Sequence, residues 1–399
     1  MTGAGPSTES PPATVSHYRP VVLCQTDDLV GVGRGRPMAL LDRDRTPVRF
    51  TVVTSVVSGL IVAGSIALAR SGLLTSSVPL WSLPVAIALT ATSLVLLRKM
   101  VSRPAQARQV FVVVPAFEQK YWLAGLVRRL HGRIDRDGVD MVLKLPACDY
   151  DASAQAHLLG RVQDRHAAYM GGIVVATAVD QQRATLTEFC ASSGLPVVFT
   201  DAEPFEHEHE YPDNAVYVGY RSAQLGELAG TWLTQHLRQR GMTRPHVLII
   251  ASREHTARQE QCRKVLRNAI PDVSITELSD CDFRRSRAYD AVRAHIRRLG
   301  SREIRLDAVF CTNDEMALGA VDAIGSTPSA ATQDTVVIGI DGIAEARALI
   351  DKGKSPLRAT VVQDANRLAE RTVLALEALH KDKKVQKRTY LEGQLHPAG

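Results

Sequence analysis

The chain has 399 residues, 45% of them hydrophobic, and a formal net charge of +6. This length allows two or three domains. The charge excess is small and the arginines are spread along the sequence, which argues against a nucleic-acid-binding surface. Only 5% of the residues are aromatic, so platforms that stack on single-stranded nucleic acid are not expected.

The first 49 residues are rich in Pro, Gly, Ser, Thr and Arg and show no lasting amphipathic period. This composition predicts a disordered tail over residues 1–49.

Two uncharged apolar runs follow, at residues 50–69 and 78–97. Each has about 20 residues, the length that crosses the hydrocarbon core of a bilayer as a helix. A cleaved signal peptide is the alternative for the first run, but a signal core is shorter and lies nearer the N-terminus. A buried soluble helix is the alternative for the second run, but its length and lack of charge argue against it. We therefore predict a transmembrane hairpin in contact with the lipid bilayer.

Positively charged residues flank this hairpin on both sides and form a basic linker at residues 98–108. Only Arg70 lies between the two runs. Since positive residues prefer the cytoplasmic side, the pattern favours cytoplasmic placement of both chain ends. The flanking residues are Arg34, Arg36, Arg43, Arg45 and Arg49 before the hairpin, and Arg98, Lys99, Arg103 and Arg108 after it.

From Gln109 onward, short apolar runs alternate with amphipathic segments, and the alternation restarts near Val247. Such a pattern predicts an α/β fold with doubly wound parallel sheets, and about 290 residues is too many for one core, so two lobes are expected. We predict strands at 110–114, 139–145, 172–176, 195–199, 215–219, 247–250, 273–278, 308–311 and 336–340, and helices at 123–134, 152–168 and 225–237.

Two of these strands end in polar residues, at Asn313 and Asp341. Ligands of such sheets bind outside the carboxyl ends of the strands, so both side chains are placed where a ligand could bind. The alternative is that Asn313 only caps a helix and Asp341 only serves a turn. Asp314 and Glu315 are expected to cap and charge the first turn of the helix that follows.

The segments CTNDEMALGAVDAI, VVIGIDG and RATVVQD resemble the sugar-binding periplasmic proteins of the ribose and galactose type, whose core the lac-repressor-like regulators share. The resemblance runs from about Gln109 to the C-terminus. It implies a two-lobed type I periplasmic-binding-protein fold with a ligand between closing lobes. By analogy, lobe 1 comprises about 109–220 and 364–390, lobe 2 comprises about 221–363 and 391–399, and the chain crosses near Tyr220, near Gln363-Asp364 and near Thr389-Tyr390.

The resemblance also implies a set of ligand contacts. A sugar needs aromatic rings for its C–H faces and fixed polar groups for its hydroxyls. The family's positions fall on Gln119, Tyr121 and Trp122 after the first strand, on Phe283 in the opposite lobe, and on the polar residues Asp201, Asn313, Asp341 and Gln363. A sandwich of Trp122 or Tyr121 against Phe283 is expected, although these aromatics could also be ordinary core residues.

The sequence departs from the family pattern at several of these positions. Ala202 stands where the family often has Arg, and Thr177 where it has Asn. Arg258 is present, but the register that matches the sugar-contacting Arg falls on Glu260. The gained acid suggests a cationic or amino-bearing ligand, held by Asp201, Glu260 and Asp341.

No catalytic constellation is found: GxSxG, the P-loop and HExxH are all absent, and neither an enzyme nor a cofactor is expected. The segment 207–210, His-Glu-His-Glu, lies between two prolines and fits a solvated loop better than a metal site. The six cysteines have no zinc-like spacing. Cys190 and Cys311 are expected to be buried free thiols, and unpaired cysteines fit better than a disulfide framework.

Three functions remain open from the sequence. The first is a membrane-anchored solute-binding protein that passes a sugar-like molecule to a permease. The second is a cytoplasm-facing ligand sensor, or a degenerate interaction module, that signals to a partner. The third, a transcription regulator, is less favoured because the segment before the core predicts membrane spans rather than a helix-turn-helix.

Overall fold

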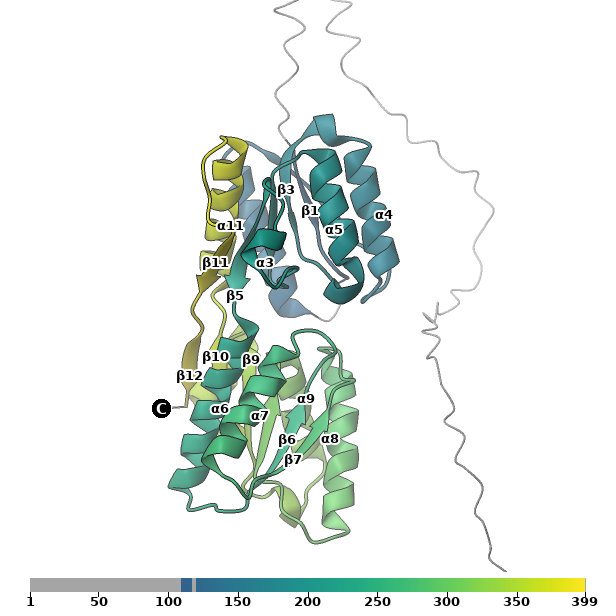
Figure 1. Ribbon diagram of the computed structural model, residues 1–399. Coiled ribbons are helices and arrows are strands. Elements are labelled where there is room, and N and C mark those ends of the chain that lie inside the picture. The colour runs from purple at the N-terminus through teal and green to yellow at the C-terminus, as the bar shows by residue number, and fades with distance from the viewer. Residues whose placement is uncertain (1–108, 117–119, 399) are drawn as a thin grey trace, which may run out of the picture. The chain divides into compact units, whose positions relative to one another are not determined.

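The computed structural model describes residues 109–116 and 120–398 (Figure 1). The predicted tail, the two predicted membrane spans, the basic linker and Gln119 lie outside these residues. Within the described part of the chain, no helix combines the length and the apolar character that crossing a membrane requires.

Lobe 1 is built on a six-stranded sheet in the order β11-β5-β4-β3-β1-β2, with every neighbouring pair parallel. Helices cover the sheet, so its central strands are buried and read as continuous apolar runs. The strands are β1 Gln109–Val113, β2 Asp140–Lys144, β3 Tyr169–Val174, β4 Val197–Thr200, β5 Ala215–Tyr220 and β11 Arg388–Leu391; the helices are α3 Tyr121–Asp135, α4 Ala152–Gln163, α5 Val179–Ser193 and α11 Ala365–His380.

Lobe 2 repeats this plan in the order β12-β10-β9-β8-β6-β7, where only the β10–β12 pair is antiparallel. The predicted two-lobed α/β fold with parallel sheets is thereby confirmed. The strands are β6 His246–Ile250, β7 Ser274–Leu278, β8 Ala308–Cys311, β9 Val336–Asp341, β10 Leu357–Val362 and β12 Gln394–Pro397; the helices are α6 Ser222–Gln239, α7 Ala257–Ala269, α8 Arg285–Gly300, α9 Asp314–Ser326 and α10 Ala344–Lys352.

The chain passes between the lobes at three places, which lie side by side in Figure 1. They are Arg221 between β5 and α6, Gln363-Asp364 between β10 and α11, and Glu392-Gly393 between β11 and β12. Residues 389 and 390, near which the third crossing was predicted, instead belong to β11 in lobe 1.

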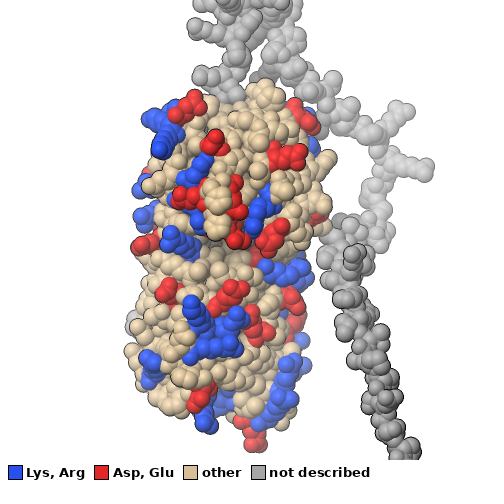
Figure 2. Space-filling model, in the orientation of Figure 1, with Lys and Arg blue, Asp and Glu red and all other residues tan. Residues whose placement is uncertain are grey.

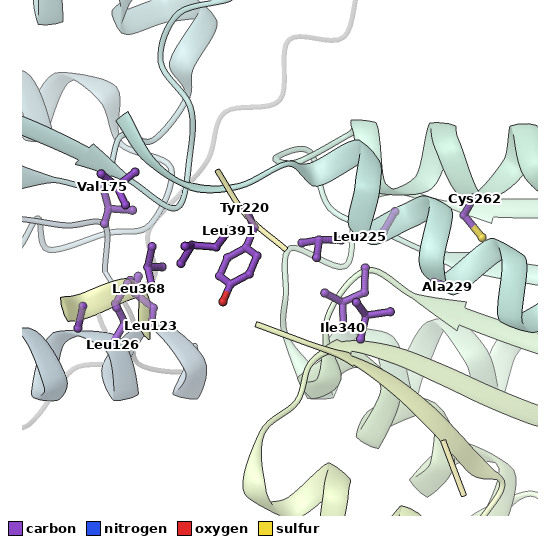
Figure 3. Close-up of a cluster of buried hydrophobic side chains, with 14 of the residues drawn as sticks. Leu123, Leu126, Val175, Tyr220, Leu225, Ala229, Cys262, Ile340, Leu368 and Leu391 are labelled. Atoms are coloured by element: carbon purple, nitrogen blue, oxygen red, sulfur yellow. The ribbon is translucent and has the colours of Figure 1, made fainter. Parts of the chain in front are cut away.

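The crossing segments are packed rather than solvated. Tyr220 and Leu391 are both 4% exposed and belong to one cluster of apolar side chains that continues from lobe 1 into lobe 2. Figure 3 shows them between Leu368 on one side and Leu225 on the other. The hydroxyl of Tyr220 also donates to the carbonyl oxygen of Asp364 at 3.3 Å, which ties the first crossing to the second.

The structure separates the cysteines into two kinds. Cys190 and Cys311 are buried free thiols, as predicted, and so are Cys262 and Cys281. Cys148 is disulfide-bonded, so the expectation of unpaired cysteines is wrong for this residue.

Candidate ligand-binding site

Two hollows lie where the lobes face each other. The inner cavity has a volume of about 40 Å³, and the outer groove about 1110 Å³. Tyr121, Trp122, Glu315 and Asp341 line both of them, so they form the passage from groove to cavity. Ligand pockets usually measure about 300–1,000 Å³, so the inner cavity as it stands is too small to hold a typical small-molecule ligand.

Lobe 1 brings aromatic and apolar side chains to the cavity. Trp122 lies in the first turn of α3, and its indole Nε1 donates to the carbonyl oxygen of Gln363 at 3.1 Å. Its neighbour Tyr121 is 64% exposed and faces the groove as well as the cavity. Asp201, directly after β4, is the carboxyl group that lobe 1 adds, and Ala202 beside it lines the cavity too.

Lobe 2 brings a network of buried polar side chains. Asp341 ends β9, and its Oδ1 accepts a hydrogen bond from Gln363 Nε2 at 2.8 Å. The guanidinium of Arg258 lies 3.8 Å from the same Oδ1, while its Nη1 donates to the carbonyl oxygen of Thr312 at 2.8 Å. Arg258 and Asp341 line the cavity directly, whereas Gln363 lines the groove and holds Asp341.

A glycine contact fixes the position of Arg258. A Cβ at Gly226 in α6 would lie 2.1 Å from the carbonyl oxygen of Arg258, so only glycine lets α6 and α7 pack this closely. Glu260 comes two residues later, about 200° further round the helix. Its side chain is accordingly exposed, and it does not line the cavity. The register that put Glu260 in the pocket is corrected in favour of Arg258.

Asn313 combines the two roles that the sequence left open. Its Oδ1 caps α9 by accepting from the backbone N–H of Met316 at 3.0 Å, and the residue also lines the cavity. Phe283 lines the cavity as expected. Its ring lies 5.9 Å from the ring of His255, centroid to centroid. Trp122 lines the same cavity, and among the described residues no ring contact joins it to Phe283.

Direct hydrogen bonds join the two lobes, and one of the residues that makes them, Glu254, lines the cavity. The Thr177 hydroxyl donates to Glu254 Oε1 at 2.6 Å, and the backbone N–H of Ala178 donates to the same oxygen at 3.1 Å. The hydroxyls of Tyr150 and Ser252 share a hydrogen bond of 3.0 Å. Thr177 therefore holds a lobe 2 carboxylate instead of lining the cavity, where the resemblance placed it.

Four titratable cavity residues are absent from the sequence-predicted set: Lys120, Glu254, His255 and Glu315. Lys120 Nζ donates to Asp149 at 2.9 Å and lies 4.0 Å from Glu254, so it takes part in the contact between the lobes. Glu254 and His255 lie in the loop between β6 and α7, at a strand's carboxyl end, which is the one signal that could have found them.

Burial dominates the electrostatics of the site. It raises the pKa of Asp201, Glu254 and Asp341 above the ordinary carboxyl range, against the opposing effect of nearby Arg258 or Lys120. Burial likewise raises the pKa of Glu315 to about 7. The pKa of His255 is held well below its usual value by burial and then by Arg258 and Lys120, so the imidazole is neutral. The 3.9 Å approach of its Nε2 to Asp201 is thus not an ion pair at neutral pH.

Unusual backbone conformations gather at the cavity. Asp201, His255, Phe283 and Asp341 all have positive φ angles, of 64°, 56°, 60° and 120°, and all four line it. Non-glycine residues in this region are uncommon and cost energy, so they persist where the surrounding structure holds a side chain in a required direction. This concentration supports a functional role for the cavity.

Asp314 supports the loop that carries Asp341. It is fully buried and accepts from the Thr360 hydroxyl at 2.7 Å and from the backbone N–H of Ile343 at 2.9 Å. Gly339 makes this possible, since a Cβ there would lie 2.2 Å from Asp314 Oδ1. Asp314 and Glu315 do occupy the first turn of α9 as predicted, but as buried groups rather than solvated helix charges.

The segment 207–210 includes a short 3₁₀ turn in which the rings of His207 and His209 stack at 5.4 Å between centroids. In residues 109–116 and 120–398, no group of three or more His, Cys, Asp or Glu side chains is arranged to hold a metal ion. On the face shown in Figure 2, basic and acidic side chains are interspersed over both lobes.

Comparisons with known proteins agree with this geometry. The family model of the periplasmic binding protein domain matches residues 111–384. A putative rhizopine-binding protein of Rhizobium meliloti is 25% identical over 305 residues, 74% of this chain and 92% of the relative. The transcriptional repressor PurR of Mannheimia succiniciproducens is 31% identical over 51% of this chain and 56% of the repressor. The structure of the Caulobacter myo-inositol binding protein bound to myo-inositol has a TM-score of 0.64 at 19% identity, covering 74% of this chain and 94% of that one, and shows a shared fold.

Proposed function

The chain belongs to the family of periplasmic binding protein domains, and we propose that it binds a small polyhydroxyl molecule, a sugar or sugar derivative, between its lobes. The observation that carries this proposal is the convergence of polar side chains from both lobes on one cavity: Asp201 from lobe 1, and Arg258, Asn313 and Asp341 from lobe 2. A carboxylate accepts a hydrogen bond from a hydroxyl, and a guanidinium donates one to a hydroxyl oxygen. This set of side chains therefore suits a ligand whose hydroxyl groups both donate and accept.

The aromatic side chains complete the match. Trp122 and Phe283 line the same cavity from opposite lobes and offer apolar faces to the C–H groups of a sugar ring. The ligand enters when the interlobe contacts part, and the lobes then close over it by hinge motion at the three crossings. Relatives named for rhizopine and ribose binding support a ligand of this general kind.

Thermal unfolding of the purified full-length chain tests this function. The panel comprises pentoses, hexoses, amino sugars, polyols and nucleosides. A ligand at 100 times its dissociation constant stabilises the native state by about 2.7 kcal/mol, which raises the melting temperature measurably. We expect at least one compound to do so, and Asp341→Ala to lose the response. A panel without any stabilising compound would contradict the proposal.

We further propose that residues 50–69 and 78–97 anchor the protein in a membrane, with the binding domain on the cytoplasmic side. The support is the excess of Arg and Lys on both flanks of the apolar pair. This placement favours ligand sensing, with a signalling partner, over delivery to a permease. A reporter fused after Gly399 that is active only in the cytoplasm tests it. Activity restricted to the opposite side would favour transport through a permease partner.

A further inference from the structure

The charges that line the inner cavity do not balance. Four carboxyl groups line it, those of Asp201, Glu254, Glu315 and Asp341, against the two cations Lys120 and Arg258. His255 adds no charge because burial keeps its imidazole neutral. Four ionised carboxylates would thus exceed the cations by two, and burial accordingly raises the pKa of all four groups. A further positive charge in the cavity would let more of them ionise.

Glu315 lacks a cation of its own, because its nearest basic neighbour, Arg285, already donates to Asp322 and Glu345. Its side chain is 2% exposed, and its Oε1 is buried without a hydrogen-bond partner. Two of the other carboxyls accept hydrogen bonds, Glu254 from Thr177 and Asp341 from Gln363. Asp201 is stabilised by the nearby charges of Arg258 and Lys120. A buried acceptor without a partner is destabilising, so its retention calls for a donor from outside the protein.

The position of Glu315 indicates where a hydrogen-bond donor of the ligand would bind. The residue lines both the inner cavity and the outer groove, together with Tyr121, Trp122 and Asp341. Arg258, deeper in the cavity, has a buried Nε that also lacks a partner. The Nε of Arg258 therefore lacks an acceptor, which a ligand hydroxyl oxygen can supply. The Oε1 of Glu315, at the passage, lacks a donor.

We propose that the ligand is an amino-bearing polyol or sugar, and that Glu315 is the counter-ion of its ammonium group, with the hydroxyls held deeper by Arg258 and Asp341. This inference rests on the proposed function and names its ligand class. An ammonium beside Glu315 lets the carboxylate ionise, supplies its missing hydrogen bond and reduces the excess of negative charge. The aromatic faces of Tyr121 and Trp122 at the same passage add a cation–π contact.

Matched ligand pairs test this assignment by isothermal titration calorimetry on the purified full-length chain. The pairs are D-glucose with D-glucosamine, D-galactose with D-galactosamine, and myo-inositol with its monoamino analogue; N-acetyl-D-glucosamine serves as the uncharged amide. We expect the amino member of the best-bound pair to bind at least about tenfold more tightly than its hydroxyl partner. Glu315→Gln should remove this preference, so that the amino and hydroxyl members of the pair bind with similar affinity.

Glu260→Gln is the matched control, because it makes the same chemical change on an exposed residue of the same lobe. It should leave the preference unchanged. Equal or tighter binding of the neutral members would overturn the amine assignment while leaving a polyhydroxyl-binding function intact. An equal loss in both variants would show a long-range charge effect and overturn the contact with Glu315. Absence of binding by every compound would overturn both this inference and the proposed function.

Discussion

The two walls of the cleft have different chemistry. Lobe 1 presents Trp122, Tyr121 and small apolar side chains, with Asp201 and Lys120 as its charged groups. Lobe 2 presents one cation, three carboxyls and an amide, held by glycine contacts and buried hydrogen bonds. Phe283 is the aromatic side chain of lobe 2, so both walls offer a face for stacking. The contrast indicates that most of the polar contacts that discriminate between ligands come from lobe 2. Substitutions in the two walls should then have different signatures.

The largest effect is expected at Asp341 in the lobe 2 wall. Asp341→Asn removes a buried carboxylate that accepts from Gln363 and balances Arg258, so ligand affinity should fall about 100-fold, or ~3 kcal/mol. Asn tolerates the positive φ of this position better than Ala, so it separates binding from folding. Titration calorimetry measures the loss, and circular dichroism reports the fold. Affinity within twofold of the native protein would exclude Asp341 from the site.

Glu315→Gln should raise stability while it weakens amine binding. The pKa of Glu315 is about 7 in the folded protein, above its usual value, so the folded state holds an extra proton between about pH 4.5 and 7. Stability is therefore lost as the pH rises through this window, by about 1–3 kcal/mol for this group. The variant should melt above the native protein at pH 8 and close to it at pH 4.5. A variant that is less stable at pH 8 would indicate a structural carboxylate.

Trp122→Ala tests the lobe 1 wall. Loss of a stacking surface should weaken all bound ligands by a similar factor of about 10, or ~1.4 kcal/mol, without changing their order. The measurement is calorimetry across the matched pairs. A change in the ratio of amine to hydroxyl affinity would instead show that lobe 1 also discriminates between ligands, which would contradict the different roles assigned to the two walls.

The smallest effect is expected for Thr177→Val, which keeps the shape of the side chain and removes the donor to Glu254. The backbone N–H of Ala178 still donates to the same oxygen, so the loss should be about 0.5–1 kcal/mol, and the ligand-free protein should populate open lobes a few-fold more often. The interlobe distance distribution reports this shift. An unchanged distribution would mean that Thr177 does not help to hold the lobes together.

The sequence revealed the parts of the site that follow from sheet geometry. Asn313 and Asp341 were predicted because the carboxyl ends of parallel strands meet at one edge, and they line the same cavity. Glu260 was misplaced because the register taken from the family resemblance was two residues from Arg258, and two residues along helix α7 turn a side chain by about 200°. A resemblance between sequences does not fix the register of a helix to the residue.

The contacts across the cleft could not be predicted from the sequence. Lys120, Glu254 and His255 acquire their roles from how the lobes approach each other, and no periodicity in one lobe encodes that approach. Glu315 is similar: its place in the first turn of α9 is typical of a solvated helix charge, but the folded protein buries it. The fold could therefore be predicted from the sequence more completely than the charges that meet in the site.

The proposed ligand binds between two lobes that open and close. Spin labels at exposed Ser153 in lobe 1 and Lys264 in lobe 2, read by pulsed electron paramagnetic resonance, test it directly. With the compound that gives the largest thermal stabilisation, the account predicts that a broad distribution with open and closed distances narrows to a single closed population. A distribution that the ligand leaves unchanged would contradict binding between the lobes.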